Sequence, residues 1–454
     1  MHRRTPALTA LTLAALAGGA WLLLRADPQP TVIFVVLDTI RADHLSLCGY
    51  ERPTSPALEA LRDRGASWTC DAVSPGTWTA PSHASFFTGL GVTEHGVHTF
   101  GGTASGVAEE GLVAGALTHG VFPMPRNVET LAETFSARGY QTLAVSANPV
   151  VSDHLELTRG FTYARAAKSF EEAYAELLLV DLEGALRQAP PERGPLFLFV
   201  NIADAHIPWR GVPRGVDWLP SQEGMTYKPE EREGDWSRFV RGEMPPDEGD
   251  ALVTRATDLY DYSVFEADQA LGEVLALVER AGWMSGGWRL VVVSDHGEML
   301  GEHGLLAHGH TVYEPNAKVP LLYLDSEGAA VDLRGPFPAI HAYHLARDGE
   351  LPASLRPVEV AAFPGASWAT WSEGWFAADP EAAVWEGTQK LTWKGGSWLE
   401  YDLEGDPGEL QPTVTGEQPE VLKDLIYRMD MSASRKGDVD EATLEMLRAA
   451  GYIE

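Results

Sequence analysis

Five short runs of apolar residues constrain most strongly how this chain can fold. Each run is rich in Val, Ile, Leu or Phe and has no regular alternation with polar residues. A strand that is apolar on both faces must be covered on both sides, which is typical of a parallel sheet between two layers of helices. The runs lie at Thr31–Leu37, Thr142–Ser146, Pro195–Ile202, Arg289–Val293 and Pro320–Leu324.

Helical patterns separate these runs. An alternation of strands and helices predicts an α/β fold with a mostly parallel sheet flanked by helices. The expected helices lie at Pro56–Arg64, Pro81–Thr88, Asn127–Arg138, Phe170–Ala189 and Leu259–Ala281. The stretch Gly211–Asp250, rich in Pro, Gly, Glu and Asp, is expected to be a surface insertion near the site.

The sequence changes character from about Gly365. Short aromatic segments joined by turns, such as KLTWKGGSWLEYDL, predict a small antiparallel sheet. Helices are expected to follow at Pro419–Met429 and Glu441–Ala450. We therefore expect an anchor and linker at 1–30, a catalytic domain at 31–364 and a small C-terminal subdomain at 365–454.

The N-terminus predicts export. His2, Arg3 and Arg4 precede an uncharged run from Ala7 to Leu24, which is just long enough to span a bilayer. We favour an uncleaved signal anchor over a cleaved signal peptide. In both cases the body of the protein would be extracytoplasmic, either periplasmic or on the cell surface, and it would be secreted if the segment is cleaved.

The net charge of the chain limits which molecules it can bind. Lys and Arg number 34 against 65 Asp and Glu, so the formal net charge is −31. Such a chain is a poor general binder of nucleic acid, and an anionic substrate would need local cations or a metal ion. The two cysteines, Cys48 and Cys70, are too few for a disulfide scaffold. A single bridge between them is open, but two buried thiols are the favoured interpretation.

Reactive side chains follow several of the predicted strands. Ligands of an open α/β sheet bind beyond the carboxyl ends of its strands, and carboxylates with imidazoles there form a metal-site pattern. These side chains are Asp38 after the first run, Asp204 and His206 after the third, and Asp295 and His296 after the fourth, with Glu302, His303, His308 and His310 further on.

The segment TWTAPSHASFFTG predicts a short helix with Thr79 at its N-terminus. The free N–H groups and the dipole of a helix N-terminus favour an anionic ligand. A threonine hydroxyl that is bound to a metal ion could ionise and attack such a ligand. By itself, however, a threonine in this position is most often only a helix cap.

Taken together, these residues resemble the sulfatase family of the alkaline phosphatase superfamily. The resemblance is carried, in the order of the family, by VIFVVLDTIRADHLSLCGYERPTSPALEALRDRGASW, SPGTWTAPSHASFFTGL, FLFVNIADAHIPW, VVVSDHGEMLGEHGLLAHGHTVYEPNAKVPLLY and EYDLEGDPGEL. It implies that Asp38, Asp295 and His296 are metal ligands and that Thr79 is the nucleophile, which also touches the metal.

The resemblance assigns further roles to histidines. His206 matches the histidine that contacts the substrate or the leaving group. His308 and His310 flank the place where many members carry a basic residue that holds the anion, so we expect both to take part in catalysis. One divalent metal ion is implied, Ca²⁺ by resemblance, with Mn²⁺, Mg²⁺ or Zn²⁺ left open.

This chain also departs from the family pattern. Sulfatases proper carry Cys-x-Pro-Ser-Arg or its Ser form, whose first residue is oxidised to formylglycine, whereas here Thr79 begins the motif and His83 replaces the arginine. Thr39 stands where a second Asp is usual, and Asn148 lies where the family has a Lys-Trp-His stretch. We expect His83 and Asn148 to bind the substrate.

Threonine nucleophiles occur in phosphoryl-transferring relatives: the nucleotide pyrophosphatase/phosphodiesterases, lipoteichoic acid synthases and phosphoethanolamine transferases. Three functions therefore remain. The first is metal-dependent hydrolysis of small or glycan-linked sulfate or phosphate esters through a covalent Thr79 intermediate. The second is a membrane-tethered phosphotransferase that acts on a glycan or lipid, and the third is a non-catalytic binding protein.

Overall fold

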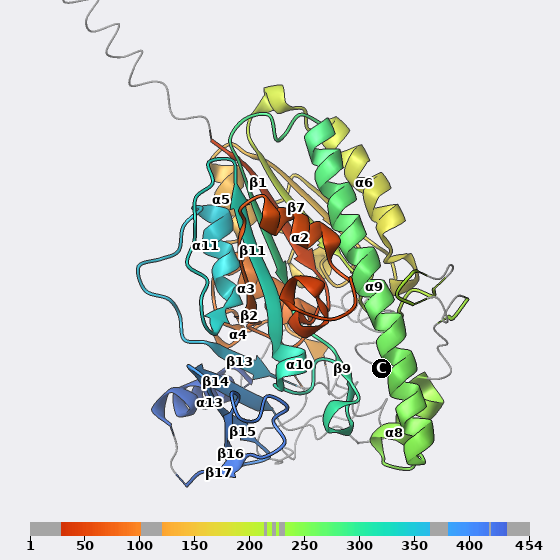
Figure 1. Ribbon diagram of the computed structural model, residues 1–454. Coiled ribbons are helices and arrows are strands. Elements are labelled where there is room, and N and C mark those ends of the chain that lie inside the picture. The colour runs from red at the N-terminus through yellow and green to blue at the C-terminus, as the bar shows by residue number, and fades with distance from the viewer. Residues whose placement is uncertain are drawn as a thin grey trace, which may run out of the picture.

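An eight-stranded sheet forms the centre of the protein in the computed structural model, which describes residues 29–100, 120–212, 216–219, 224–226, 232–363, 380–416 and 419–433 (Figure 1). The strand order is β12-β2-β11-β8-β1-β7-β5-β6. The strands are β1 (Thr31–Leu37), β2 (Ser67–Val73), β5 (Gln141–Ser146), β6 (Tyr163–Ala166), β7 (Leu196–Ile202), β8 (Trp288–Ser294), β11 (Lys318–Asp325) and β12 (Phe337–Pro338).

Most neighbouring strands in this sheet are parallel. β1 pairs in parallel with β7 and β8, and β5 does so with β6 and β7, whereas β11 is antiparallel to both β8 and β2. Each of the five apolar runs forms one of these strands, namely β1, β5, β7, β8 and β11. The predicted α/β class with a mostly parallel sheet is confirmed.

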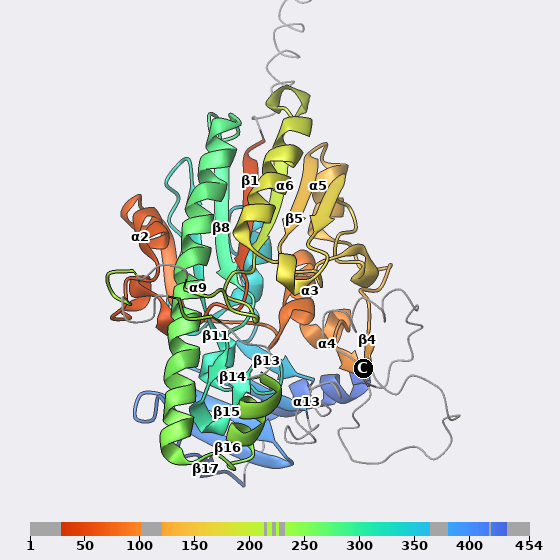
Figure 2. The same ribbon diagram turned by 90° about the vertical axis from the view of Figure 1, so that its right-hand side faces the viewer.

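Helices cover both faces of the sheet. Ile33 and Val35 of β1 belong to the core under α2 (Pro56–Asp63), α6 (Ala175–Gln188) and α9 (Pro246–Arg280). Phe34 and Val36 point to the opposite core, under α3 (Thr79–Thr88), α5 (Leu131–Ala137) and α11 (Ala342–Arg347). Figures 1 and 2 show these two layers on either side of the strands. The two covered faces explain why β1 is apolar without alternation.

A second sheet lies at one end of the molecule (Figure 2). It is antiparallel and contains β13 (Glu359–Ala362), β14 (Glu381–Glu386), β15 (Gln389–Lys394), β16 (Ser397–Asp402) and β17 (Thr413–Val414). Helix α13 (Glu420–Ala433) packs Leu422 and Leu425 against it. The predicted C-terminal sheet and helix are confirmed, although β13 precedes the expected boundary at 365. The expected helix Glu441–Ala450 lies outside the described residues.

Helix α9 corrects the expected insertion. It begins at Pro246, inside the stretch 211–250 that was expected to be irregular, and it is 35 residues long. Its start carries ordinary helix signals, because Pro246 occupies the first turn and Asp247 and Glu248 complement the helix dipole. The helix expected at Leu259–Ala281 thus begins 13 residues earlier, within the last five residues of the expected surface insertion.

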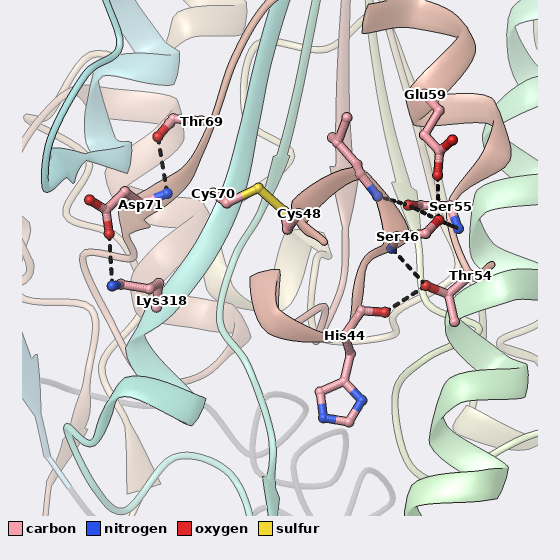
Figure 3. The surroundings of a disulfide bond; sticks show 11 residues. His44, Ser46, Cys48, Thr54, Ser55, Glu59, Thr69, Cys70, Asp71 and Lys318 are labelled. Atoms are coloured by element: carbon pink, nitrogen blue, oxygen red, sulfur yellow. Dashed lines mark hydrogen bonds and ion pairs between the residues drawn. A yellow bond between two sulfur atoms is a disulfide. The ribbon is translucent and has the colours of Figure 1, made fainter. Parts of the chain in front are cut away.

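The expectation of two buried thiols is wrong, because Cys48 and Cys70 form a disulfide (Figure 3). The 3₁₀ turn Ser46–Cys48 lies close enough to β2 for their Cα atoms to be 5.8 Å apart, a normal separation for a bridge. Both side chains are only half-buried. Sequence spacing alone could not show this approach, because it depends on how the turn folds back onto β2.

The predicted anchor at residues 7–24 falls outside the described part of the chain. Among the described residues, no helix combines the length and the apolar character that a membrane crossing requires.

Candidate metal centre and active site

The parallel pairing of β1 with β8 brings three predicted metal ligands together. Leu37 and Ser294 are register partners at the carboxyl ends of the two strands, so Asp38 and Asp295 follow side by side. One ligand atom from each of Asp38, Asp295 and His296 lies within 4.8 Å of the others. All three residues are fully buried. The structure thus holds a buried Asp–Asp–His group that could bind one metal ion.

Two atoms of this group, Oδ2 of Asp295 and Nε2 of His296, are oriented as metal ligands would be. Oδ1 of Asp295 accepts hydrogen bonds from the backbone N–H groups of Thr39 and His296, each at 3.0 Å. Nδ1 of His296 donates to the carbonyl oxygen of Gly297 at 2.9 Å, which leaves Nε2 as the lone-pair atom. Asp295 Oδ2 and His296 Nε2 lie 3.4 Å apart and have no hydrogen-bond partner among the described residues. A cation would satisfy both atoms.

The electrostatics of the group favour a cation as well. Burial and the neighbouring charge of Asp38 raise the pKa of Asp295 well above its usual value. Burial also lowers the pKa of His296 to about 4, so its imidazole is neutral at neutral pH. Carboxylate oxygens with a neutral imidazole nitrogen form a ligand set for a divalent ion, which would relieve the repulsion between the two buried carboxylates.

Asp38 is held by three donors. Its Oδ1 accepts from the hydroxyl of Thr39 at 2.8 Å, and its Oδ2 accepts from the amides of Asn148 at 2.9 Å and Asn201 at 3.1 Å. Burial opposes the charge of this carboxylate, but His206 and the other histidines around it, together with these hydrogen bonds, lower its pKa overall. Thr39, which stands where a second Asp is usual, therefore orients two of the predicted ligands, Asp38 and Asp295.

Thr79 lies beside this group, at the first position of α3 as predicted. Its hydroxyl oxygen accepts a hydrogen bond from Nδ2 of Asn148 at 3.1 Å, and the same Nδ2 donates to Asp38. Oδ1 of Asn148 accepts from the N–H of Val150 at 2.9 Å, which fixes the orientation of the amide. Asn148 thus bridges the predicted nucleophile and a predicted ligand, while its expected contact with substrate stays a prediction.

His83 is fully buried, one turn further along α3. Its Nδ1 donates to the carbonyl oxygen of Thr79 at 2.9 Å, and its Nε2 accepts from the amide of Asn201 at 3.1 Å. Burial lowers its pKa to about 4, so the ring is neutral. Both ring nitrogens are therefore engaged within the protein, and anion binding by His83 stays a prediction.

His206 and His308 border the metal group. The ring of His308 lies 4.3 Å from that of His296 and 5.0 Å from that of His206. His206 stacks on Phe170 with the ring centroids 4.3 Å apart, and Nδ1 of His308 contacts Oε1 of Glu298 at 3.1 Å. The ring of His308 thus lies beside His296 and that of His206 beside His308, while the expected part of both in catalysis stays a prediction.

The remaining residues that follow the strands have other contacts. Nδ1 of His310 donates to the carbonyl oxygen of His308 at 3.0 Å, and burial lowers the pKa of His310 to about 4. Glu302 forms an ion pair with Arg41 at 2.6 Å, and His303 stacks on Tyr313 with the ring centroids 3.7 Å apart.

Two buried side chains of the site, Asn201 and Glu298, escaped the sequence analysis. Each carried a weak signal. Asn201 is the single amide in the apolar strand LFLFVNI, and Glu298 follows the metal-ligand motif SDHG. A polar residue in a buried strand needs a partner, but the sequence does not show which one.

Comparisons with known proteins agree with this geometry. The family model described as Sulfatase matches residues 30–344. Part of the chain is similar to the phosphatidylethanolamine transferase Mcr-1 of Escherichia coli, with 44% identity over 68 residues, which cover 15% of this chain and 12% of that protein. The chain spans only 12–35% of the length of the curated relatives that it matches.

Solved structures show the same fold. The phosphonate monoester hydrolase of Agrobacterium radiobacter superposes with a TM-score of 0.60 at 15% identity, covering 89% of this chain and 96% of that one. A 2-O GAG sulfatase superposes with a TM-score of 0.58 at 16% identity, covering 94% and 98%. Because the family model covers more than half of the sequence and the folds agree over nearly the whole chain, this protein belongs to the sulfatase family.

Proposed function

We propose that this protein is a metal-dependent hydrolase that transfers a phosphoryl or sulfuryl group from an ester first to Thr79 and then to water. The observation that carries this proposal is the hydrogen-bonded row from Asp38 through Asn148 to Thr79. It puts a hydroxyl at a helix N-terminus directly beside a buried metal-binding group.

Asp38, Asp295 and His296 would hold one divalent ion, with Thr79 as a further ligand. The two unpartnered atoms of Asp295 and His296 support this assignment. Carboxylates suit Ca²⁺, Mg²⁺ or Mn²⁺, and the imidazole also suits Zn²⁺, while the family resemblance favours Ca²⁺. When bound, the ion would supply positive charge that stabilises the anionic oxygens of the ester and the ionised form of a neighbouring hydroxyl.

Each residue around the ion would have a separate role in the reaction. Asn148 holds the hydroxyl oxygen of Thr79 in place, and Thr79 forms a bond to phosphorus or sulfur as the bond to the leaving oxygen breaks. His206, with His308, would give that oxygen a proton. His310 is neutral at neutral pH, because burial lowers its pKa to about 4, so its expected part in this transfer would run through its contact with His308. A water molecule then displaces Thr79 and releases the anion.

The preferred substrate should be a phosphoryl ester rather than a sulfate ester. A threonine is not a known precursor of formylglycine, so the aldehyde-hydrate route of ordinary sulfatases is closed to Thr79. Threonine forms an ordinary ester intermediate, which water must cleave. The similar structures include both phosphonate monoester hydrolases and sulfatases, so both classes of ester belong in the test.

The test is a panel of substrates given to the purified protein with and without added divalent ions. The panel contains a phosphate monoester, a phosphodiester, a phosphonate monoester, an aryl sulfate and a sulfated glycosaminoglycan fragment. We expect turnover of at least one phosphoryl ester, lost on chelation. Strong aryl sulfatase activity without phosphoesterase activity would contradict the preference. Failure to turn over any ester, together with tight ion binding, would favour the non-catalytic alternative.

Thr79→Ala should lower the rate by roughly 10³-fold or more, because it removes the nucleophile. Thr77→Val is a matched control, since Thr77 is equally buried two residues away and its hydroxyl has no hydrogen-bond partner among the described residues. Rapid quenching followed by peptide mass spectrometry should find the transferred group on Thr79. Near-normal turnover by Thr79→Ala would rule out the covalent route.

One observation favours the phosphotransferase alternative. The 68-residue match to Mcr-1 is at 44% identity, well above the identity of the similar structures. Adding a lipid or glycan alcohol to the assay separates the two functions. A transferase would pass the group to that alcohol in preference to water, whereas a hydrolase would release free anion at an unchanged rate.

A further inference from the structure

The C-terminal sheet makes several polar contacts with the segment that directly follows His308 and His310. Four consecutive residues, Thr311–Glu314, receive hydrogen bonds, ion pairs or ring contacts from β14, from β15 or from the turn that follows β16. These contacts join two parts of the chain that lie about 70 to 95 positions apart. They connect the second sheet directly to the segment that carries His308 and His310.

Glu381 of β14 makes the first contact. Its Oε2 accepts from the hydroxyl of Thr311 at 2.9 Å and from the N–H of Val312 at 3.1 Å. Its Oε1 forms an ion pair with Lys394 at 2.7 Å, and Nζ of Lys394 lies 4.5 Å from the ring centroid of Tyr313. One buried carboxylate therefore fixes the backbone two residues beyond His310.

Lys390 of β15 makes the second contact. It is fully buried, and its Nζ donates to the carbonyl oxygen of Val312 at 2.7 Å and to Oε1 of Glu409 at 2.5 Å. The other oxygen of Glu409 accepts from the N–H of Glu314 at 2.7 Å. The ammonium also lies 4.7 Å from the ring centroid of Trp385. The segment is thus held on both sides of Tyr313.

A buried lysine is a costly way to hold a fold together. The desolvation of a buried ion pair largely offsets its attraction, and well-packed apolar residues often stabilise a protein as much. Charged hydrogen bonds are directional, however, and they fix a backbone in one position. The position fixed here is that of the chain that carries His308 and His310, and His308 lies 4.3 Å from His296.

We propose that Glu381 and Lys390 are positioning residues. They hold the segment that carries His308 and His310 and thereby keep His308 beside the metal group, so that the C-terminal sheet contributes to the geometry of the active site. This inference deepens the proposed function and rests on it for the role of the two histidines. It predicts that substitutions in β14 and β15 change the reaction rate, although the metal group Asp38, Asp295 and His296 contains no residue of either strand.

The test compares Lys390→Met, Glu381→Ala and Glu381→Gln with the unchanged protein. Glutamine keeps an oxygen acceptor for Thr311 and Val312, so Glu381→Gln should restore much of what Glu381→Ala loses. Thr392→Val is the matched control, because Thr392 is buried on β15 between the two lysines and its hydroxyl has no hydrogen-bond partner among the described residues.

The first readout does not depend on turnover. His308 and His310 are only 2% and 4% exposed, so diethyl pyrocarbonate should modify them slowly in the folded protein. Peptide mass spectrometry should show modification roughly 10-fold faster in Lys390→Met and Glu381→Ala, because the local opening becomes easier. Unchanged rates in variants that melt cooperatively would overturn the proposal, whatever the activity.

The second readout is the rate on the best ester of the panel. We expect kcat to fall roughly 10- to 10²-fold in Lys390→Met and Glu381→Ala with a much smaller change in KM, because misplacement affects the transition state most. Faster modification with an unchanged kcat would overturn the positioning role. If the unchanged protein turns over no ester, the proposed function fails, and the modification rates still decide whether the sheet holds the histidines. If Lys390→Met does not fold, the Glu381 pair decides.

Discussion

Asn201 links several parts of the site through one side chain. Its Nδ2 donates to Asp38 Oδ2 and to His83 Nε2, each at 3.1 Å, and its Oδ1 accepts from the hydroxyl of Ser146 at 3.3 Å. The partners come from the end of β1, from α3 and from β5. An amide that serves both a carboxylate and an imidazole fixes the tautomer of His83 and the direction of Asp38 together.

These contacts lead to a prediction for His83. Because both of its ring nitrogens bond within the protein, we expect His83→Gln to lower kcat roughly 10-fold or more while KM changes little, since Thr79 and Asn201 lose their support. Steady-state kinetics on the best ester of the panel would measure both constants.

His95→Gln is the control for His83→Gln. His95 is equally buried, and its Nε2 forms a hydrogen bond of 2.9 Å with Ser85 of α3, the helix that carries His83. The two substitutions should therefore lower the melting temperature by similar amounts. Only the His83 variant should lose kcat. A rise in KM at unchanged kcat would instead support the sequence-based prediction that His83 binds the anion of the substrate.

At the scale of helices and strands, the sequence predicted the strands of the central sheet that are apolar on both faces and missed those that are not. Strand β2 reads SWTCDAV and is only partly buried, so its Thr and Asp hide the strand pattern. The candidate ligands Asp38, Asp295 and His296 could be predicted because each lies within two positions of the end of an apolar strand. Asn201 and Glu298 could not, because their roles depend on which strands become neighbours.

Helix α2 gives a prediction at this scale. Its N-cap residue, Ser55, makes no capping bond with its side chain; instead the two carboxylate oxygens of Asp268 in α9 accept from Ala57 N at 2.7 Å and Leu58 N at 3.0 Å. Asp268→Asn replaces one acceptor by a donor that faces an N–H group. We expect it to destabilise the protein by about 1–3 kcal/mol, measured by chemical unfolding.

The control for Asp268 lies at the other end of the same helix. Asp63 is exposed, and Arg62 is its one ion-pair partner among the described residues. Asp63→Asn should therefore leave the unfolding free energy within about 0.5 kcal/mol of its starting value. Both variants should keep normal turnover. An Asp268→Asn protein as stable as the Asp63→Asn protein would show that the carboxylate does not cap α2.

At the scale of the whole molecule, the charge of −31 makes the environment of the site unusual. An anionic ester approaches a surface that repels it, and this repulsion is screened beyond about 8 Å at physiological salt. The attraction must therefore come from within the site. An ion held by Asp38, Asp295 and His296, as the proposed function has it, would supply such an attraction.

The Cys48–Cys70 disulfide leads to the last prediction, which concerns where the folded protein resides. Disulfides persist in oxidising compartments, so the bridge supports the proposal that the body is extracytoplasmic, as the charged-then-apolar N-terminus also predicts. Cells that make the full chain should be lysed with a thiol-blocking reagent present. We expect neither cysteine to be blocked, and the protein to fractionate with membranes or with the extracytoplasmic contents.

The free energy of unfolding gives a second, independent test of the Cys48–Cys70 bridge. The bridge closes a loop of 22 positions, so replacing both cysteines by serine should lower the free energy of unfolding by about 3 kcal/mol, because the unfolded chain gains freedom. A reducing agent should destabilise the unchanged protein by a similar amount and leave the double variant unaffected. Two blocked thiols in a chain recovered from the cytosol would refute the proposed location, whereas an equal loss of stability on reduction would still confirm the bridge itself.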